Sequence, residues 1–296
     1  MTGGLLWLWL ALASSVISAQ NTEMNRKAKQ ESFRLNLWRM GLASCFWLPL
    51  AVMHDSWPSL TEDTLFYFAA VGSGMGLIVG FTITNDLAMK HNSRVAVLHM
   101  PLKALFVFLM WALFMPEARA DYFSNPEKTF GILACLLVIG MALMNFRRND
   151  ASWETFVAVL PIVGIYGAFD IFSRLGMPLG GDFLAHFIVF MCVMSLSSFV
   201  ASLAFLPWRP KPELPLMHPK LVRAAGWAAI GGVMNQTCFF AALLLGPSPA
   251  YVSMIVLLTP VWLLVYHRLA KIKDDASPIA GTVIVAAAMV LMYLVA

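Results

Sequence analysis

Residues 183–206 read FLAHFIVFMCVMSLSSFVASLAFL and contain no Asp, Glu, Lys or Arg. An α-helix needs roughly 20 apolar residues to cross a bilayer core of about 30 Å, so this stretch is long enough to span a membrane. Comparable stretches recur along the whole chain, near 5–24, 36–53, 64–87, 94–115, 129–146, 153–175, 183–206, 222–245, 250–268 and 277–296. The sequence therefore predicts an all-α integral membrane protein with ten transmembrane helices.

The composition leaves little chain for a soluble domain. Charged residues make up 12% of the 296 residues, and the mean hydropathy is +0.75. Strands of a membrane barrel run only about 9–11 residues with alternating polarity, so these long apolar stretches indicate helices. The net charge of +4 is small and lies in the connections, which suggests contact with membrane lipid and not with nucleic acid. The four cysteines show no paired spacing, and we expect free thiols.

Lysine and arginine are unevenly shared between the two sets of connections. One alternate set holds fifteen of them and the other holds only three: Arg119, Lys128 and Arg174. Basic connections stay in the cytoplasm, so the count predicts that both termini lie on the outer side of the membrane. In a bacterial inner membrane, the localisation that we expect, that side is the periplasm.

Two shifts of similar size bring parts of the chain into register with each other. A shift of 147 residues carries an acid and two bases onto matching types, Glu23, Lys27 and Arg39 onto Asp170, Arg174 and His186. A shift of 159 residues carries one proline within an apolar stretch onto another, Pro101 onto Pro260. The chain therefore divides into two five-helix repeats, residues 1–148 and 149–296, within one membrane domain. Because five is odd, the second repeat would enter the membrane inverted.

The chain resembles the drug/metabolite transporter superfamily, in particular its ten-helix EamA-like members. The resemblance covers nearly the whole chain and rests on three features besides the helix number: Arg39 within Leu37-Trp38-Arg39-Met40, the Gly-Pro-Ser-Pro-Ala link at 246–250, and Pro260 after it. It implies a substrate cavity lined mainly by helices 1, 3, 4, 6, 8 and 9, opened to one side at a time. Two features depart from the family: its termini are usually cytoplasmic, and its helix 4 is usually apolar where this chain has Lys103.

Lys103 is the most informative of the ionisable residues within the apolar stretches. A charge at the bilayer centre is costly and normally faces a cavity or a partner. Lys103 would anchor a carboxylate or phosphate, with His99 one turn earlier on the same face. The alternative is that Lys103 pairs permanently with Asp86 or Asp170 and holds helices together.

Amide and acidic side chains supply further candidates for substrate binding. Asn85 and Asp86 end the third stretch, and Asn235 and Gln236 follow two glycines in the eighth. Amides offer donors and acceptors to a polar solute. Helix–helix hydrogen bonds, or a surface pair between Asp86 and Lys90, would explain the same residues without a ligand.

The remaining candidates lie on the first, sixth and ninth stretches. Glu23 with Lys27, and Asp170 with Arg174, have the spacing of salt bridges at i, i+4. Asp170 is the better binding candidate of the two acids, because Tyr166 precedes it by one turn. We further expect polar contacts to the cavity from three side chains: Gln20 beside Asn21, and Tyr251.

Two prolines, Pro101 and Pro260, each remove a backbone donor within an apolar stretch. They would act as hinges between the two halves or, alternatively, as static kinks.

The motifs that are absent from the sequence narrow the function further. The chain has no glycine-rich phosphate loop, no His/Cys metal spacing and no Gly-x-Ser-x-Gly motif, so we expect no enzyme activity, no cofactor and no metal. With the resemblance, this predicts a secondary transporter of amino acids or other carboxylate-bearing metabolites, with protons as a coupling ion. The alternatives are a translocator of lipid, lipid-linked or nucleotide-linked sugars, a membrane-embedded transferase, and a structural membrane subunit.

Overall fold

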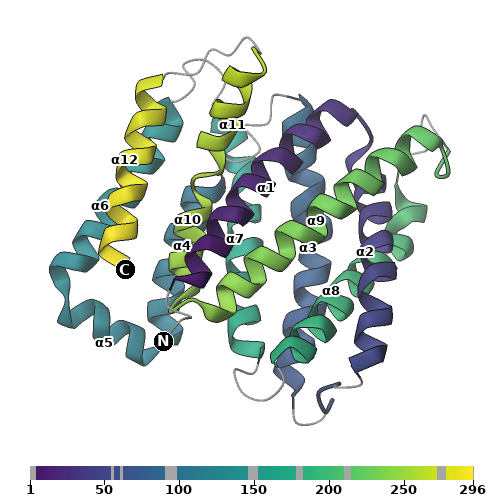
Figure 1. The fold of residues 1–296 in the computed structure, drawn as a ribbon, viewed down its shortest axis with the longest axis horizontal. Coiled ribbons are helices and arrows are strands. Elements are labelled where there is room, and N and C mark those ends of the chain that lie inside the picture. Colours follow the sequence, from purple (N-terminus) through teal and green to yellow (C-terminus); the bar gives the residue numbers. More distant parts are fainter. Residues whose placement is uncertain are drawn as a thin grey trace.

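The computed structural model describes residues 5–54, 57–60, 63–90, 99–145, 153–177, 183–209, 215–271 and 278–295. Within these ranges the regular structure is helical and no strand is present (Figure 1). The α-helices are α1 (Leu6–Ala28), α2 (Ser32–His54), α3 (Thr64–Lys90), α4 (His99–Phe114), α5 (Pro116–Ser124), α6 (Pro126–Asn145), α7 (Trp153–Gly176), α8 (Phe183–Phe205), α9 (Pro219–Leu245), α10 (Pro249–Val256), α11 (Thr259–Leu269) and α12 (Pro278–Val295).

Helices cover the described part of each apolar stretch, with two departures. The stretch 250–268 is split between α10 and α11, because the helix ends at Val256 and the chain turns at Leu257 and Leu258. The short helix α5, which the sequence analysis did not anticipate, follows α4 at a bend of 107°.

Several helices are long and apolar enough to cross a membrane. In the described part of the chain five segments meet this condition, and α4 with α5 would make a sixth if the bent pair were one span. The five are Thr64–Leu87, Val159–Gly176, Leu184–Trp208, Pro219–Leu245 and Pro249–Leu269. The protein is therefore a multi-pass membrane protein.

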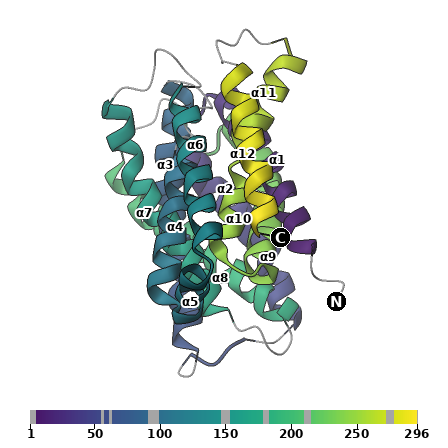
Figure 2. The ribbon, with the colours of Figure 1, turned by 90° about the vertical axis from the view of Figure 1, so that its left-hand side faces the viewer.

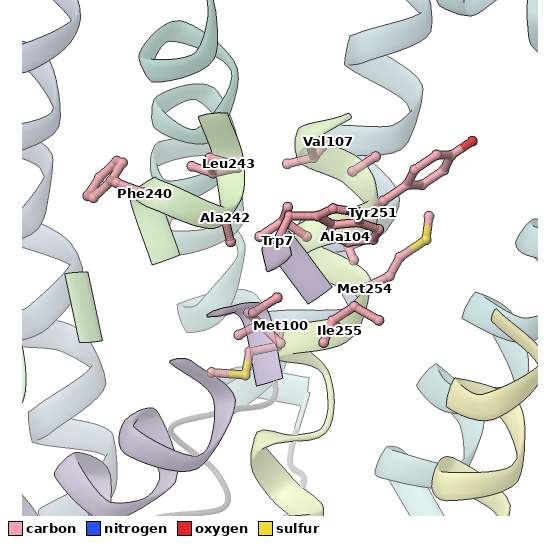
Figure 3. Close-up of a cluster of buried hydrophobic side chains, with 14 of the residues drawn as sticks. Trp7, Met100, Ala104, Val107, Phe240, Ala242, Leu243, Tyr251, Met254 and Ile255 are labelled. Carbon is pink, nitrogen blue, oxygen red and sulfur yellow. The ribbon is translucent and has the colours of Figure 1, made fainter. Parts of the chain in front are cut away.

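The helices pack as an irregular bundle with a smaller pair at one side. α1 lies along α9, α2 lies against α8, and α3 contacts both α7 and α8 (Figure 1). α6 and α12 pack against each other at the edge of the bundle (Figure 2). Where α1, α4, α9 and α10 meet, an apolar core forms around Trp7, Ala104, Leu243 and Ile255 (Figure 3).

Close contact of α3 with its neighbours depends on glycine. Two glycines of α3 face α7. A Cβ at Gly76 would clash with the Phe169 ring, and a Cβ at Gly80 would clash with the Tyr166 ring. Gly74 faces α8 instead, and a Cβ there would meet the Met194 backbone carbonyl oxygen. Small residues let helix backbones approach closely in membranes. The glycines of α3 therefore set its distance from both α7 and α8.

We expect Gly74→Ala to destabilise the protein by about 1–3 kcal/mol, because a backbone carbonyl cannot move aside as a flexible side chain can. The measurement is the thermal unfolding temperature in detergent. The matched control is Gly164→Ala, also within a helix, where an added Cβ would have no heavy atom within 4 Å. Equal unfolding temperatures for the two variants would contradict this account of the α3–α8 contact.

Candidate functional site

A cavity of about 170 Å³ lies between the helices of the main bundle. Its walls come from α1, α2, α3, α4, α7, α9 and α10. The lining residues are Ser14, Ser18, Asn21, Thr22, Asn25, Arg39, Ser73, Leu77, Phe81, Thr84, Asn85, His99, Met100, Lys103, Tyr166, Phe169, Asp170, Asn235, Gln236, Phe239, Phe240 and Val256. Both halves of the chain therefore line one cavity, whose wall combines polar side chains with aromatic and aliphatic ones.

The structure brings most of the proposed binding residues to this cavity. Those that line it are Asn85, His99, Lys103, Tyr166, Asp170, Asn235 and Gln236. Asp86, Gln20 and Tyr251 do not line it. Successive helix positions are turned by about 100°, so Asp86 and Gln20 point away while their neighbours Asn85 and Asn21 face the cavity. Tyr251 belongs to the apolar core (Figure 3).

Lys103 and Asp170 form a buried ion pair between α4 and α7. The ammonium nitrogen of Lys103 is 2.7 Å from Oδ2 of Asp170, and both side chains are more than nine-tenths buried. The hydroxyl of Ser253 on α10 donates to the same carboxylate oxygen at 2.8 Å. The Lys103 ammonium also lies 4.9 Å from the centroid of the Phe239 ring. Lys103 is therefore paired with Asp170 in the structure, which is one of the two pairs named in the alternative to an anchor role.

The local pair that the spacing of Asp170 and Arg174 predicts is wrong. Asp170 reaches across to Lys103 instead. Arg174 donates to the backbone carbonyl oxygens of Leu244, at 2.5 Å, and Gly246, at 3.3 Å. The last carbonyls of a helix lack partners within it, so Arg174 satisfies the end of α9.

The first acid–base pair does form, within a larger cluster at the end of α1. The Glu23 carboxylate is 3.8 Å from the Lys27 ammonium, but Arg26 is closer at 2.6 Å. Nε2 of His267, on α11, lies 3.2 Å from the other carboxylate oxygen. Glu23 therefore ties α1 to α11. The surface pair proposed for Asp86 and Lys90 lies outside the described side chains.

Arg39 on α2 lines the cavity, although it was not among the binding residues predicted from the sequence. Its side chain is buried, 5% exposed, with the guanidinium carbon 3.7 Å from the centroid of the Phe81 ring. Among the described residues no carboxylate forms an ion pair with it. Gly232 on α9 makes room for it, since a Cβ there would be 2.5 Å from Nε of Arg39. The signal was available: an arginine within an apolar stretch meets the criterion that singled out Lys103.

Amide and hydroxyl groups of the cavity connect the helices around it. The Ser14 hydroxyl donates to Oδ1 of Asn235 at 2.8 Å, and Nδ2 of Asn25 donates to Oδ1 of Asn85 at 3.1 Å. Nε2 of Gln236 is buried without a hydrogen-bond partner among the described residues.

A polar stripe on α1 provides much of one wall of the cavity. Of its members, only Asn21 was predicted from the sequence to contact the cavity. The spacing would have revealed the others, because Ser14, Ser18, Asn21 and Asn25 recur with the period of one helix face.

The two candidate hinge prolines lie in different surroundings. Pro260 lies near the middle of the span Pro249–Leu269, as expected, where the break after α10 puts it in the first turn of α11. Pro101 is the third residue of α4 as described, and the residues before His99 lie outside the described ranges. In contrast, Pro49 and Pro161 do lie within helices, α2 and α7.

The described part of the chain holds no group of three or more His, Cys, Asp or Glu side chains that could bind a metal ion. Of the acids and bases that line the cavity, Lys103 and Asp170 form an ion pair, and Arg39 and His99 are the remaining bases.

Removing one member of the Lys103–Asp170 pair should destabilise the fold strongly. Lys103→Met leaves a buried carboxylate whose remaining partner is a hydroxyl, and losing one partner of a buried pair costs about 3–5 kcal/mol. The double variant Lys103→Met/Asp170→Asn leaves no unpaired charge at this position, so its unfolding temperature should exceed that of Lys103→Met. A double variant less stable than the single one would mean that the pair contributes little in the folded protein.

No family model matches the chain, and no curated protein matches its sequence. Among solved structures, one described as "Crystal structure of protein" is similar over 100% of this chain and 97% of its own, with a TM-score of 0.67 and 15% sequence identity. The whole chain therefore shares its fold with a protein of known structure.

Proposed function

We propose that this protein is a secondary transporter that moves small polar metabolites, amino acids or other carboxylate-bearing solutes, across a bacterial inner membrane. The observation that carries the proposal is the cavity between the two halves, in which buried Arg39, Lys103 and Asp170 lie beside serine, threonine and amide groups. Buried ionisable groups in membrane proteins mark substrate and ion pathways. Alternating access to this cavity would move a solute without a chemical reaction.

The packing of the helices supports ten spans in two inverted repeats. In the two proposed repeats, α1 corresponds to α7, α2 to α8 and α3 to α9. Likewise α4 corresponds to α10 together with α11, and α6 corresponds to α12. The contacts can be compared by exchanging each helix for its counterpart. Under this exchange the contact of α1 with α9 becomes that of α7 with α3, and the contact of α3 with α8 becomes that of α9 with α2. The contact of α4 with α7 becomes that of α10 and α11 with α1. The pairs α2–α8, α4–α10 and α6–α12 are their own counterparts. Inverted repeats of this kind place substrate sites at their interface.

The charged contacts follow the same exchange. Glu23 on the first helix of one half meets His267 on the fourth helix of the other. Asp170 on the first helix of the second half meets Lys103 on the fourth helix of the first. Each half therefore holds the other through an acid–base contact at matching places. Rocking of the halves around the cavity, with Pro101 and Pro260 as hinges, would change these contacts.

The size of the cavity favours a small solute over the alternative of a lipid-linked or nucleotide-linked sugar. Pockets for drug-sized ligands measure roughly 300–1,000 Å³. The space between these helices is about 170 Å³. A translocator of long-chain lipids would need a much larger space or a lateral opening.

Transport is tested by counterflow with the purified protein in liposomes. Vesicles are loaded with an unlabelled solute and diluted into the same solute in labelled form. The solutes tested are carboxylates, amino acids, sugars and cations. We expect transient accumulation of label for a carboxylate-bearing solute, and none in protein-free vesicles. Label accumulation for no class, together with no ligand-dependent rise in the unfolding temperature, would contradict a transporter.

The orientation is tested separately with reporter fusions. From the fifteen-to-three distribution of lysine and arginine we expect a reporter fused after Ala296 to read as periplasmic. A cytoplasmic reading there would mean that the topology usual in the family outweighs the charge distribution.

A further inference from the structure

We infer that Arg39, and not Lys103, receives the charged group of the solute, and that the cavity selects solutes with a single negative charge over zwitterions and dianions. The inference rests on the proposed function for the site and names its substrate class. It differs from the expectation that the sequence gives, in which Lys103 is the anchor and amino acids are the first candidates.

The charge of the cavity lining is the first argument. The lining residues that carry a formal charge, with histidine counted as neutral, are Arg39, Lys103 and Asp170. Lys103 and Asp170 compensate each other at 2.7 Å. One positive charge remains, on Arg39. A monoanion would neutralise it, whereas a zwitterion would leave it and a dianion would replace it with a negative charge. Because uncompensated charge is costly in a buried site, the monoanion is favoured.

The surroundings of Arg39 are the second argument, because they hold the guanidinium in place without neutralising it. The Phe81 ring lies against its face at 3.7 Å, and the backbone of α9 at Gly232 lies against its edge. A guanidinium presents its donors in a planar fork that matches the two oxygens of a carboxylate. An arginine fixed in this way has already lost much of its conformational freedom, which favours ligand binding.

A second donor lies close to this position along α9. Gln236 follows Gly232 by four residues, so the two are neighbours on one face of the helix. The Gln236 side chain lines the cavity, is 5% exposed, and has an amide nitrogen without a partner among the described residues. A buried amide donor of this kind normally has an acceptor. A carboxylate oxygen, or a hydroxyl next to the carboxylate, would supply one.

The first experiment compares four probes that differ mainly in charge. L-Lactate is a monoanion, L-alanine its zwitterionic counterpart, lactamide its neutral amide, and malonate a dianion of similar size. Binding to the purified protein is measured by calorimetry and by the rise in unfolding temperature, with acetate and benzoate as further monoanions. We expect at least one monocarboxylate to bind, and to bind more tightly than L-alanine, lactamide and malonate. Tighter binding of the zwitterion or the dianion, or binding of none of the monocarboxylates, would overturn the inference.

The second experiment replaces Arg39 and a matched arginine elsewhere. Arg39→Met should weaken monocarboxylate binding about tenfold or more, the size expected for lost hydrogen bonds to a charged group. Arg39→Lys keeps the charge but loses the fork, so it should weaken binding less than Arg39→Met does. The control is Arg209→Met, which removes an exposed arginine that stacks on Phe33 at 4.2 Å outside the cavity. Equal binding by Arg39→Met and the control would overturn the inference.

The unfolding temperature without ligand separates a binding role from a structural one. Removing an uncompensated buried cation should leave the empty Arg39→Met protein at least as stable as the natural one. A structural arginine would give a fall instead. If Lys103→Met/Asp170→Asn loses monocarboxylate binding while Arg39→Met keeps it, Lys103 is the anchor and the inference is wrong.

The binding and counterflow experiments test the anion site and the transport function separately. Binding that depends on Arg39 without counterflow would keep the anion site and reject the transporter. Counterflow of a zwitterion that does not depend on Arg39 would keep the transporter and reject the anion site.

Discussion

The ion pair between Lys103 and Asp170 joins helices from opposite halves of the chain at a place where little else carries charge. Each group is buried, so each depends on the other, and together they fix α4 against α7 beside the cavity. The hydroxyl of Ser253 brings α10 to the same carboxylate. These contacts hold α4, α7 and α10 together, and the three helices form the wall of the cavity opposite α1. The ion pair also decides which charge of the cavity remains available to a ligand.

The helices could be predicted from hydropathy because their cause is local. The stretch 183–206 became α8, Phe183–Phe205, almost residue for residue. The break between α10 and α11 could not be placed in the same way. Pro260 lies in the first turn of a new helix, whereas Pro49 and Pro161 lie inside theirs, although all three prolines lack a backbone N–H donor. At the break the Thr259 hydroxyl donates to the Val256 carbonyl oxygen at 2.7 Å. The turn is buried among neighbouring helices, and this packing cannot be predicted from the local sequence.

The members of the site could be predicted better than their partners. A polar residue in an apolar helix is conspicuous in any sequence, and Lys103, Asn85 and Asn235 were found in this way. The partners depend on which helices meet. Asp170 has Arg174 one turn away, but the guanidinium satisfies the end of α9 and leaves the carboxylate to Lys103. Arg39 carries the same sequence signal as Lys103, but the sequence does not show that α2 packs beside α9 and so places Arg39 at the cavity.

Many of the helix contacts have a counterpart when the two halves of the chain are exchanged, but the charges do not. Glu23 has three bases near it at the end of α1, whereas Asp170 has one base and a hydroxyl beside the cavity. Arg39 lines the cavity, but His186, its counterpart after the shift of 147 residues, does not. A ligand shifts a conformational equilibrium only through a difference in its affinity for the two states. Under the proposed alternating access, an anion held mainly by Arg39 would meet this condition, because the two states of an inverted repeat would surround Arg39 with different helices. The unequal charges would then let one bound solute favour one of the two states.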